Sequence, residues 1–280
     1  MKPTNNIKEL ALIANQLRQD LIAMLVTAGS GHTASPLALA DLLAVLYFSQ
    51  LHQRPRQPLW PKRDRLIFSA GHVVPIRYVA MARAGYFPLS RLATLRRFGS
   101  SLQGHPSLVD FPVMETSGGP LGQGISVAVG LALAGQLDQS KHRIYVVCSD
   151  AEMEEGQLWE AAMTAAKYGL GNLTAFLDRN NIQISGTTDD VMPLDPVREK
   201  WRSFQWQAIS INGHDHQAII DAINLAQKFT NEPTVIILNT VPGQGVSFME
   251  NDYRWHGRVP TAEEGKRALR ELQTARNKIS

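Results

Sequence analysis

Apolar residues recur at helical spacing along the first part of the chain. Between Ile7 and Ala28 they return every three or four positions, the period of an amphipathic helix, until Gly29-Ser30-Gly31 ends the pattern. A second helix is expected from Pro36 to about Phe48, because proline is tolerated in a first turn. Helical patterns also continue from Gly71-His72 through Met81 and cover Leu89 to Phe98. The N-terminal region is therefore predicted to be mainly helical.

Further along, short runs of β-branched and apolar residues alternate with helical stretches. The expected strands are Arg65 to Ser69, a run beginning at Ile144, a run beginning at Asn172, Trp206 to Ile211, and Thr234 to Thr240. The expected helices among them are Ile125 to Ala134, a long helix after Asp150, and His214 to Phe229. Strands that alternate with helices of this length predict an α/β fold, with a mostly parallel sheet covered by helices on both faces.

The length of 280 residues allows either one large domain or two small ones. No internal repeat, low-complexity tract or long linker divides the chain, so a single domain over residues 1–280 is expected. It would begin with the helical segment described above. From about Thr261 a charged, helical tail is expected to lie at the periphery.

Charge and cysteine content narrow the class of protein. The net charge of +3 comes from 28 basic and 25 acidic residues, and no basic block concentrates it, which argues against a nucleic-acid-binding protein. Cys148 is the only cysteine, so no disulfide can form within the chain, as is usual in a reducing cytosol. The N-terminus has no apolar signal core, and no apolar run is long enough to span a bilayer. A soluble, cytoplasmic protein without membrane contacts is expected.

Asp150 and Asn180 suggest a metal site. Each directly follows an expected strand, and the two strands are joined by a helix. Strands connected in this way lie parallel, so their carboxyl ends share one edge of the sheet. A carboxylate and an amide oxygen at that edge suit Mg²⁺, which is usually held by one or two protein groups together with substrate phosphates. The pattern therefore indicates a metal-anchored diphosphate at the edge of the sheet.

The segment from Gly118 to Gly124 is a glycine-rich turn before a helix of small residues. It has neither the G-x-G-x-x-G order of a dinucleotide fold nor the Gly-Lys-Ser/Thr of a P-loop. Its glycines allow close approach of backbone to a ligand, and the helix that follows favours an anion or a polar ring atom at its N-terminus. They equally suit a tight turn before a closely packed helix, so both interpretations stay open.

Four histidines lie in loops, each next to a glycine: His32, His72, His105 and His256. Their spacing matches no zinc motif, and they suit hydrogen bonding to phosphates and hydroxyls. The remaining histidines have no comparable setting and are interpreted as structural: His52, His142, His214 and His216. Glu155 and Glu160 are five positions apart on the helix after Asp150, which does not place them squarely on one face, and solvated helix charges explain them equally well.

Together these motifs resemble a known family. The chain resembles the N-terminal, diphosphate-binding part of transketolase, through motifs that run almost from end to end. The matching segments are Gly31-His32, Arg63 to His72, Gly104-His105-Pro106, Gly119 to Ser126, Glu155 to Ala161, Gly171-Asn172-Leu173, Asn180 to Gly186, and Gly213-His214-Asp215. Each segment is short, and their common order and spacing carry the resemblance.

The resemblance implies thiamine diphosphate with a divalent metal, Mg²⁺ or in its place Ca²⁺ or Mn²⁺, and the transfer of two-carbon ketol units between sugar phosphates. The residues at the family's positions fall into four groups. The metal ligands would be Asp150, Asn180 and the Ile182 carbonyl, and the contacts to diphosphate or substrate hydroxyls would be His32, His72 and His105. The cofactor contacts would be Gly119, Leu121 and Ala151. The interface carboxylates would be Glu155 and Glu160. His256 lies where the family places another site histidine.

Two departures from the family are visible. Its thiamine diphosphate signature begins Gly-Asp-Gly, whereas this chain has Ser149-Asp150-Ala151. If position 151 required a positive φ, or a backbone contact closer than a Cβ allows, alanine would cost about 1–2 kcal/mol. The chain also ends before the family's pyrimidine-binding domain, which supplies the glutamate that activates the cofactor.

A split transketolase is therefore expected, in which this chain is the N-terminal subunit. A C-terminal subunit with the pyrimidine-binding domain would complete an α2β2 enzyme, and this chain alone would be inactive. The alternatives are a subunit of another thiamine diphosphate enzyme, similar to deoxyxylulose phosphate synthase or to a 2-oxo acid decarboxylase or dehydrogenase, or a subunit that has lost the cofactor and serves only assembly.

Overall fold

The computed structural model describes residues 3–279. It begins with α1 (Ile7–Ala28), whose Asn6 side chain caps the first turn by accepting the Glu9 N–H at 3.2 Å. The helix ends at Gly29, which adopts a left-handed φ of 62° that favours glycine. The bounds predicted from the apolar pattern are thus confirmed.

The second predicted helix is interrupted. In place of one helix from Pro36 to Phe48, the chain forms α2 (Ala34–Ala38), α3 (Ala40–Val45) and a π-helical turn over Leu46–Gln50. Nearly every residue of this run is buried, so packing from all sides replaces the one-sided pattern that sets helix bounds. The structure next forms a 3₁₀ turn over Gly71–Val73 and α4 (Val74–Ala84), while the helix expected from Leu89 to Phe98 is only a 3₁₀ turn over Leu89–Thr94.

Five parallel strands form the sheet, in the order β1-β2-β3-β5-β4. Their bounds are β1 (Arg65–Phe68), β2 (Ile144–Ser149), β3 (Leu173–Arg179), β4 (Gln207–Asn212) and β5 (Thr234–Asn239). The register pairs Ser149 with Asp178, so the segments that follow β2 and β3 leave the sheet side by side. The predicted parallel α/β sheet is confirmed.

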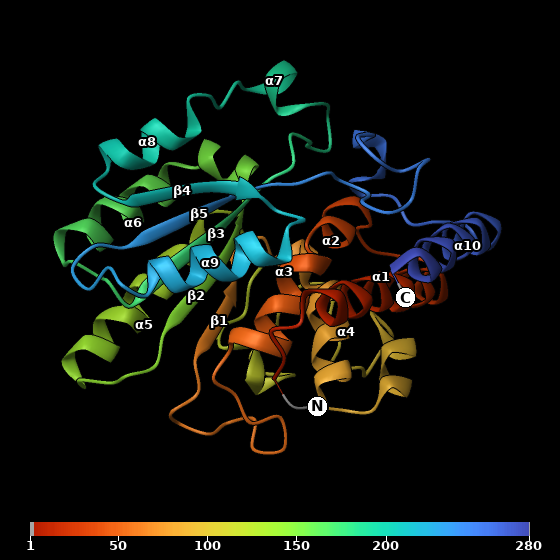
Figure 1. Cartoon of the computed structure of the whole chain (residues 1–280), viewed down its shortest axis with the longest axis horizontal. Helices are drawn as coiled ribbons and strands as arrows, with labels where there is room; N and C mark the ends of the chain where they lie inside the picture. The colour runs from red at the N-terminus through yellow and green to blue at the C-terminus, as the bar shows by residue number, and fades with distance from the viewer. Residues whose placement is uncertain (1–2, 280) are drawn as a thin grey trace.

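Helices cover both faces of the sheet, as Figure 1 shows. Alternate strand residues point to opposite faces, so Phe68 and Val147 pack with α1, α3, α4 and α9 (His216–Ala226). Ile67 and Val146 pack on the other face, against α5 (Gln123–Leu137), α6 (Gly156–Lys167) and α8 (Val197–Ser203). Both faces are apolar along the strands, which explains why the strand sequences are continuous apolar runs.

Several short elements lie around this core. The sequence pattern missed α7 (Thr188–Val191) and α8, which follow β3. Three further 3₁₀ turns are Pro112–Met114, Asp150–Glu154 and Tyr253–Trp255. The tail forms α10 (Ala262–Ile279) beside α1, as Figure 1 shows. Ala268 and Leu272 of α10 are fully buried, so this helix is less peripheral than its charged sequence suggests.

Of the helices in residues 3–279, none combines the length and the apolar character that a membrane span requires.

Candidate functional site

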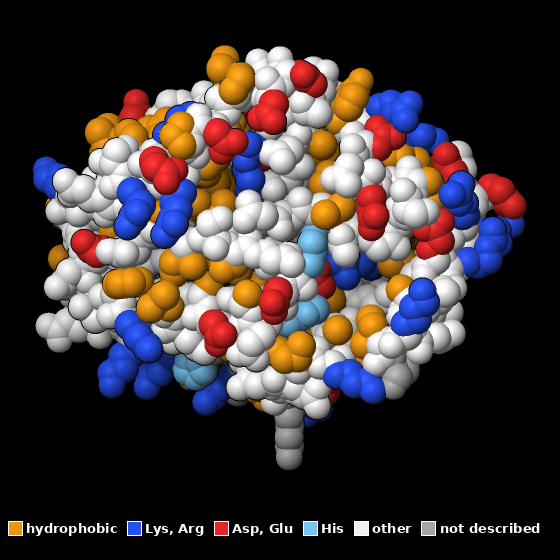
Figure 2. All heavy atoms as spheres, turned by 45° about the horizontal axis from the view of Figure 1, so that its top comes forward, with side chains coloured by type: hydrophobic (Ala, Val, Ile, Leu, Met, Phe, Trp, Pro, Cys, Tyr) orange, Lys and Arg blue, Asp and Glu red, His pale blue; other side chains and the backbone are white. Residues whose placement is uncertain are grey.

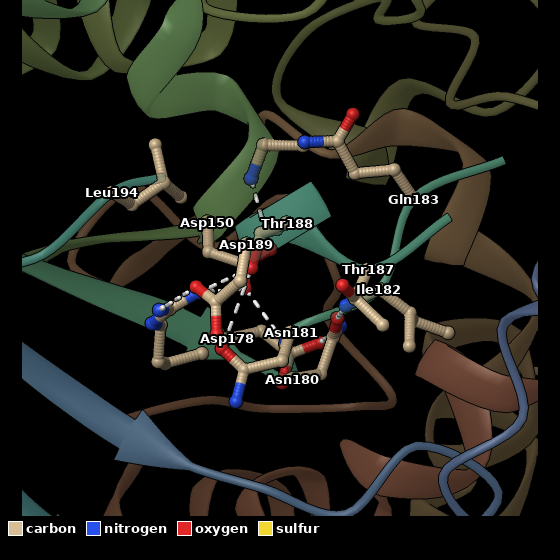
Figure 3. Close-up of polar contacts among 12 residues, drawn as sticks. Asp150, Asp178, Asn180, Asn181, Ile182, Gln183, Thr187, Thr188, Asp189 and Leu194 are labelled. Atoms are coloured by element: carbon tan, nitrogen blue, oxygen red, sulfur yellow. Dashed lines mark hydrogen bonds and ion pairs between the residues drawn. The ribbon is translucent and has the colours of Figure 1, made fainter. Parts of the chain in front are cut away.

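Asp150 lies directly after β2, where it opens a 3₁₀ turn, and its carboxylate is completely buried. Oδ1 accepts the N–H of Ala151 at 2.9 Å, and Oδ2 accepts the N–H of Asn181 at 2.9 Å. The guanidinium of Arg179, at the end of the neighbouring strand β3, donates to Oδ2 at 3.2 Å. Figure 3 shows Asp150 facing the loop after β3. Burial raises the pKa of this carboxyl, and these donors oppose that rise.

The side chain of Asn180 is oriented by two partners. Its Nδ2 donates to Asp178 Oδ2 at 2.6 Å and to Ser35 Oγ at 3.2 Å. Its Oδ1 accepts the N–H of Ile182 at 3.1 Å and is therefore the oxygen that a cation could share. Burial, together with the charge of nearby Asp150, raises the pKa of Asp178 to about 7. The predicted pairing of Asp150 and Asn180 at one sheet edge thus has a defined geometry.

Ile182 lies in a loop that turns back on itself. Asn181 has a left-handed φ of 62°, and Ile182 and Thr187 form an antiparallel bridge. The two hydrogen bonds beside this bridge run from Gln183 N to Gly186 O at 2.8 Å and from Thr188 N to Asn181 O at 3.0 Å. Neither uses the Ile182 carbonyl, so that oxygen is not consumed by the bridge.

The available ligands at this edge are oxygens of three kinds. They are the Asp150 carboxylate, the Asn180 amide oxygen and the Ile182 carbonyl, and such hard donors suit Mg²⁺ or Ca²⁺. Within residues 3–279, no group of three or more His, Cys, Asp and Glu side chains could hold a metal ion. The donor chemistry therefore fits a cation that completes its coordination with ligand oxygens, and not a zinc site.

His32, His72 and His256 form a cluster of three rings, although they come from distant parts of the sequence. The ring centroids are 4.8 Å apart for His32 and His72, 5.6 Å for His32 and His256, and 5.1 Å for His72 and His256. Figure 2 shows histidine side chains, in pale blue, near the centre of the visible face. The cluster thus unites three of the four histidines that the sequence singles out.

Each ring of this cluster has one buried nitrogen that lacks a hydrogen-bond partner among the described residues. These atoms are Nδ1 of His32, Nε2 of His72 and Nδ1 of His256. Burial lowers the pKa of all three, that of His32 to about 4 and that of His72 well below its usual value. The rings are therefore neutral at pH 7, and each can donate one hydrogen bond and accept another. Such unpaired buried groups are rare and suit a ligand's oxygens.

His105 and the glycine-rich turn lie against the same loop as His72. A Cβ added to Gly71 would lie 2.9 Å from Gly119 N and 3.2 Å from His105 Cδ2, so only glycine permits this approach. Gly119 itself has a φ of 148°. His105 is more exposed than the three clustered rings, and partial burial followed by the charge of Arg96 lowers its pKa. The fourth loop histidine therefore borders the cluster.

One hydrogen bond joins the histidine cluster to the edge that carries Asp150, and a second joins two segments of the cluster. Ser35, three residues after His32, accepts the Asn180 amide as described above. Thr33 Oγ1 donates to the carbonyl of Arg258 at 2.6 Å, which ties the His32 loop to the segment of His256. The cluster and the metal-binding oxygens are thus parts of one connected site.

Within the glycine-rich turn, Gly122 has a φ of 75° and is the N-cap of α5. The N–H of Gly122 donates to Glu152 Oε1 at 2.7 Å, and the N–H of Gly124 donates to Ser69 Oγ at 3.1 Å. The turn is therefore bound to the ends of both β1 and β2. Leu121 is half-buried within it.

Ala151 follows Asp150 inside the 3₁₀ turn, and it is not among the described residues with a positive φ. The left-handed conformation that would have penalised alanine is therefore not required, and that possible cost does not apply. Ser149 has an extended backbone, and its N–H donates to Glu152 Oε2 at 2.8 Å.

Glu155 and Glu160 are both exposed. The sequence pattern placed Glu155 on the helix after Asp150, but Glu155 is the N-cap of α6, since the 3₁₀ turn before it ends at Glu154. A Cβ added to Gly122 would lie 2.9 Å from Glu155 Cβ, so this carboxylate lies beside the glycine-rich turn. Their exposed position is compatible with an interface.

Of the histidines interpreted as structural, two border a buried carboxylate away from the cluster. His214 Nδ1 lies 2.7 Å and His216 Nε2 3.3 Å from the side chain of Asp41. Arg18 contacts the same carboxylate. This group joins α1 and α3 to the start of α9, which is a structural role.

Sequence reasoning missed two buried charged residues of the site, Glu152 and Arg179. Glu152 had a readable signal, because Ser149-x-x-Glu152 has the form of a capping box. Arg179 had none, because its partners Asp150, Thr188 and Asp195 are distant in sequence and come together only in the fold.

Comparison with known proteins gives consistent matches. Residues 10–277 match the family described as transketolase, thiamine diphosphate binding domain. The chain is 41% identical over 260 residues to 6-deoxy-6-sulfo-D-fructose transketolase subunit SqwG of a Clostridium species, covering 93% of this chain and 94% of that protein. It is 37% identical over 273 residues to an apulose-4-phosphate transketolase subunit of Phocaeicola vulgatus, covering 98% and 97%.

Solved structures include a similar chain. The transketolase of Campylobacter jejuni superposes with a TM-score of 0.89 at 32% identity, covering 98% of this chain and 46% of that one. This chain therefore spans nearly all of the two subunit relatives and about half of the longer chain.

Proposed function

The chain belongs to the transketolase family, whose thiamine diphosphate-binding domain it spans, and from this premise we propose that it is the N-terminal subunit of a two-chain transketolase. The enzyme would move a two-carbon ketol unit from a ketose donor to an aldose acceptor. Both substrates would be sugar phosphates or similar anionic sugars. Thiamine diphosphate would supply the electron sink that accepts the transferred unit.

The lengths of the relatives support the two-chain arrangement. Both subunit relatives are covered over 94% or more of their length, and their names describe subunits of transketolases. Only 46% of the Campylobacter jejuni chain is covered. We infer that a separate chain with the pyrimidine-binding domain completes the site, in an α2β2 complex. Glu155, exposed beside the glycine-rich turn, and the exposed Glu160 are the proposed contacts to that other half.

At the sheet edge, Asp150, the Asn180 amide oxygen and the Ile182 carbonyl would hold Mg²⁺, or in its place Ca²⁺ or Mn²⁺, against the diphosphate. The fit rests on the fixed amide orientation, because Asp178 and Ser35 hold Asn180 Nδ2 and leave Oδ1 for a cation. This ligand set leaves coordination positions for phosphate oxygens, as Mg²⁺ sites usually do.

The histidines would bind the diphosphate and the substrate hydroxyls. His32, His72 and His256 offer buried ring nitrogens, and His105 borders them at the surface. Neutral rings can donate to a diphosphate oxygen or exchange a hydrogen bond with a hydroxyl without carrying a charge. Backbone atoms of Gly119 and Leu121 would contact the cofactor rings, and Ala151 would lie beside the diphosphate.

One observation carries the proposal: three neighbouring histidine rings, each with an unpaired buried nitrogen, lie in a site that the Ser35–Asn180 hydrogen bond connects to the sheet edge. In a protein that only supports assembly, each such desolvated group would cost about 1–3 kcal/mol without contributing to ligand binding. A cytosolic location stays a prediction from the single cysteine, Cys148, which is buried.

Calorimetry tests the cofactor part of this proposal. The chain would be titrated with thiamine diphosphate and Mg²⁺, both alone and in complex with a partner chain that carries a pyrimidine-binding domain. We expect binding that requires both the cofactor and the metal, and that is tighter in the complex. Absence of binding in the complex would instead support a subunit that serves only assembly.

A further inference from the structure

Glu152 is a buried carboxylate at the meeting point of three loops that carry proposed cofactor contacts. We propose that Glu152 is a positioning residue, which fixes the glycine-rich turn against the ends of β1 and β2. It would thereby set where the cofactor rings lie relative to the diphosphate. This inference rests on the proposed function, and it assigns a role to a residue that does not itself contact the cofactor.

The side chain of Glu152 is fully buried and accepts hydrogen bonds from three separate segments. Oε1 accepts the N–H of Gly122, in the glycine-rich turn, at 2.7 Å, and also the hydroxyl of Ser69, at the end of β1. Oε2 accepts the N–H of Ser149, the last residue of β2, at 2.8 Å. A single carboxylate therefore binds the turn of Gly119 to the two strand ends.

A second connection runs through Ser69. Its hydroxyl donates to Glu152 and accepts the N–H of Gly124 at 3.1 Å, so two amides of the turn depend on this carboxylate. A Cβ added to Gly124 would lie 2.5 Å from Ser69 Cα, which shows how closely the turn approaches β1. The turn is thus held by directed hydrogen bonds at a distance that no other residue at position 124 would allow.

All partners of the Glu152 side chain are donors. A carboxylate can accept all of them, whereas the amide of glutamine would turn an NH₂ group toward one donor. None of the ion pairs among residues 3–279 includes Glu152, so the hydroxyl and the backbone N–H groups hold the carboxylate in place. Hydrogen bonds to a charged acceptor are about twice as strong as neutral ones. Glu152→Gln should therefore release the turn while changing the side-chain volume very little.

The metal side of the site does not depend on Glu152 in the same way. Asp150 is held by the N–H groups of Ala151 and Asn181 and by Arg179, and none of these bonds involves Glu152. Glu152→Gln should therefore weaken contacts to the cofactor rings more than contacts to the diphosphate. A residue that merely stabilised the whole fold would weaken both alike.

The experiment compares two ligands in the complex of this chain with its partner chain. Calorimetry would measure the Kd of thiamine diphosphate with Mg²⁺, and the Kd of inorganic diphosphate with Mg²⁺, which lacks the rings. For Glu152→Gln we expect the first Kd to rise about tenfold, equal to about 1.4 kcal/mol, and the second to change less than about threefold. The matched control is Glu199→Gln, on the exposed side of α8, which should change neither.

Ser69→Ala provides a second variant in case Glu152→Gln fails to fold. It removes one donor to Glu152 and the acceptor for Gly124, and it should give the same selective loss at about half the size in free energy. Equal loss of both ligands, or loss of neither, in the folded variant would overturn the proposed role of Glu152.

Hydrogen exchange of the ligand-free chain distinguishes this inference from the proposed function. The amides of Gly122 and Gly124 should exchange at least about tenfold faster in Glu152→Gln, because their protection comes from these bonds. If the unmodified complex binds neither ligand, the proposed function fails, whatever the exchange rates. If it binds both and the exchange rates are unchanged in the variant, the inference about Glu152 fails alone.

Discussion

The two halves of the candidate site differ in how fully their polar atoms are paired. At the edge that carries Asp150 and Asn180, the polar side-chain oxygens already accept bonds from neighbouring amides and from Arg179. In the cluster of His32, His72 and His256, one nitrogen of each ring is buried without a partner. Folding alone thus pairs the side chains of Asp150 and Asn180, whereas the histidine cluster carries buried nitrogens that a ligand can satisfy.

This difference predicts that mutations in the two regions will affect stability and ligand binding differently. Removing a group from the paired edge leaves its partners unsatisfied, so stability and binding should fall together. Removing an unpaired histidine takes away a desolvated polar group, so binding should fall with little loss of stability. Five variants or conditions examine this contrast, in order of decreasing expected effect.

The largest effect is expected for Asp150→Ala. It removes a proposed metal ligand and leaves the guanidinium of Arg179 without its buried carboxylate partner. We expect binding of thiamine diphosphate with Mg²⁺ to weaken by at least about 1000-fold, equal to about 4 kcal/mol. Asp189→Asn is the matched control, since its exposed carboxylate lies 3.8 Å from the same guanidinium. If calorimetry gave similar losses of affinity for both variants, Asp150 would not be a metal ligand at this edge.

Arg179→Met removes the positive charge that lies beside Asp150 in the folded chain. Breaking this buried pair should lower the free energy of unfolding of the ligand-free chain by about 3 kcal/mol, because Asp150 stays buried without its cation. Mg²⁺ would replace part of the lost positive charge, so it should raise the melting temperature more in the variant than in the unmodified chain. Urea unfolding and thermal melts would measure both, with the exposed Arg202→Met as control. An equal response to Mg²⁺ would argue against a cation beside Asp150.

His72→Leu examines the unpaired cluster. The change removes a buried nitrogen without a partner, so the free energy of unfolding should stay within about 1 kcal/mol of its original value. Binding of thiamine diphosphate should weaken by roughly tenfold, through the loss of one hydrogen bond to the ligand. A loss of stability as large as that expected for Arg179→Met would remove the contrast between the two regions.

The cluster should also respond to pH. Burial, together with the neighbouring charges of His256, Arg96 and His105, lowers the pKa of His32 from 6.5 to about 4. The unfolded chain gains this proton near pH 6.5 and the folded chain only near pH 4, so the free energy of unfolding should fall as the pH drops between these values. Above pH 6.5 this group should have no influence on stability.

Buried carboxyls with a raised pKa, such as Asp178, give the opposite slope of the free energy of unfolding against pH. The contribution of His32 is therefore obtained by comparing the slopes of two proteins. Chemical unfolding from pH 4 to pH 7 would compare the chain with His32→Gln. The slope of the free energy of unfolding against pH reflects the number of protons taken up on unfolding. In the variant this number should be smaller by up to about one proton. Identical slopes would show that His32 titrates normally in the folded state.

The smallest effect is expected for Ala151→Gly. Because Ala151 has no positive φ, glycine relieves no backbone strain at this position. We expect the Kd of thiamine diphosphate to change less than about twofold and stability to fall by about 0.5–1 kcal/mol. Binding that tightens tenfold would show that the alanine Cβ obstructs the ligand.

The sequence predicts the frame of this site better than its details. Apolar periodicity locates α1 and the five strands, and parallel connection then places Asp150 and Asn180 at one edge. The break between α2 and α3 is invisible to that pattern, because residues buried on every side have no apolar stripe. The short helices α7 and α8 were also not predicted, because one or two turns contain too few positions for a helical period to appear.

The side-chain partners could not be predicted from local sequence. Arg179 meets Thr188 and Asp195 only because the chain folds back after β3, and the histidine cluster joins positions 32, 72 and 256. Loop residues with glycine neighbours were a correct guide to where these rings gather. They gave no information about which nitrogen would stay unpaired, because that depends on the tertiary surroundings.

Reconstitution of ketol transfer tests the central claim most directly. The chain, a partner chain with a pyrimidine-binding domain, and an equimolar mixture of the two would be assayed with thiamine diphosphate, Mg²⁺, and a ketose phosphate and an aldose phosphate as substrates. We predict transfer by the mixture only, with a rate that saturates near one partner chain per chain. Transfer at the same rate by this chain alone would contradict the account of a subunit that carries half of the active site.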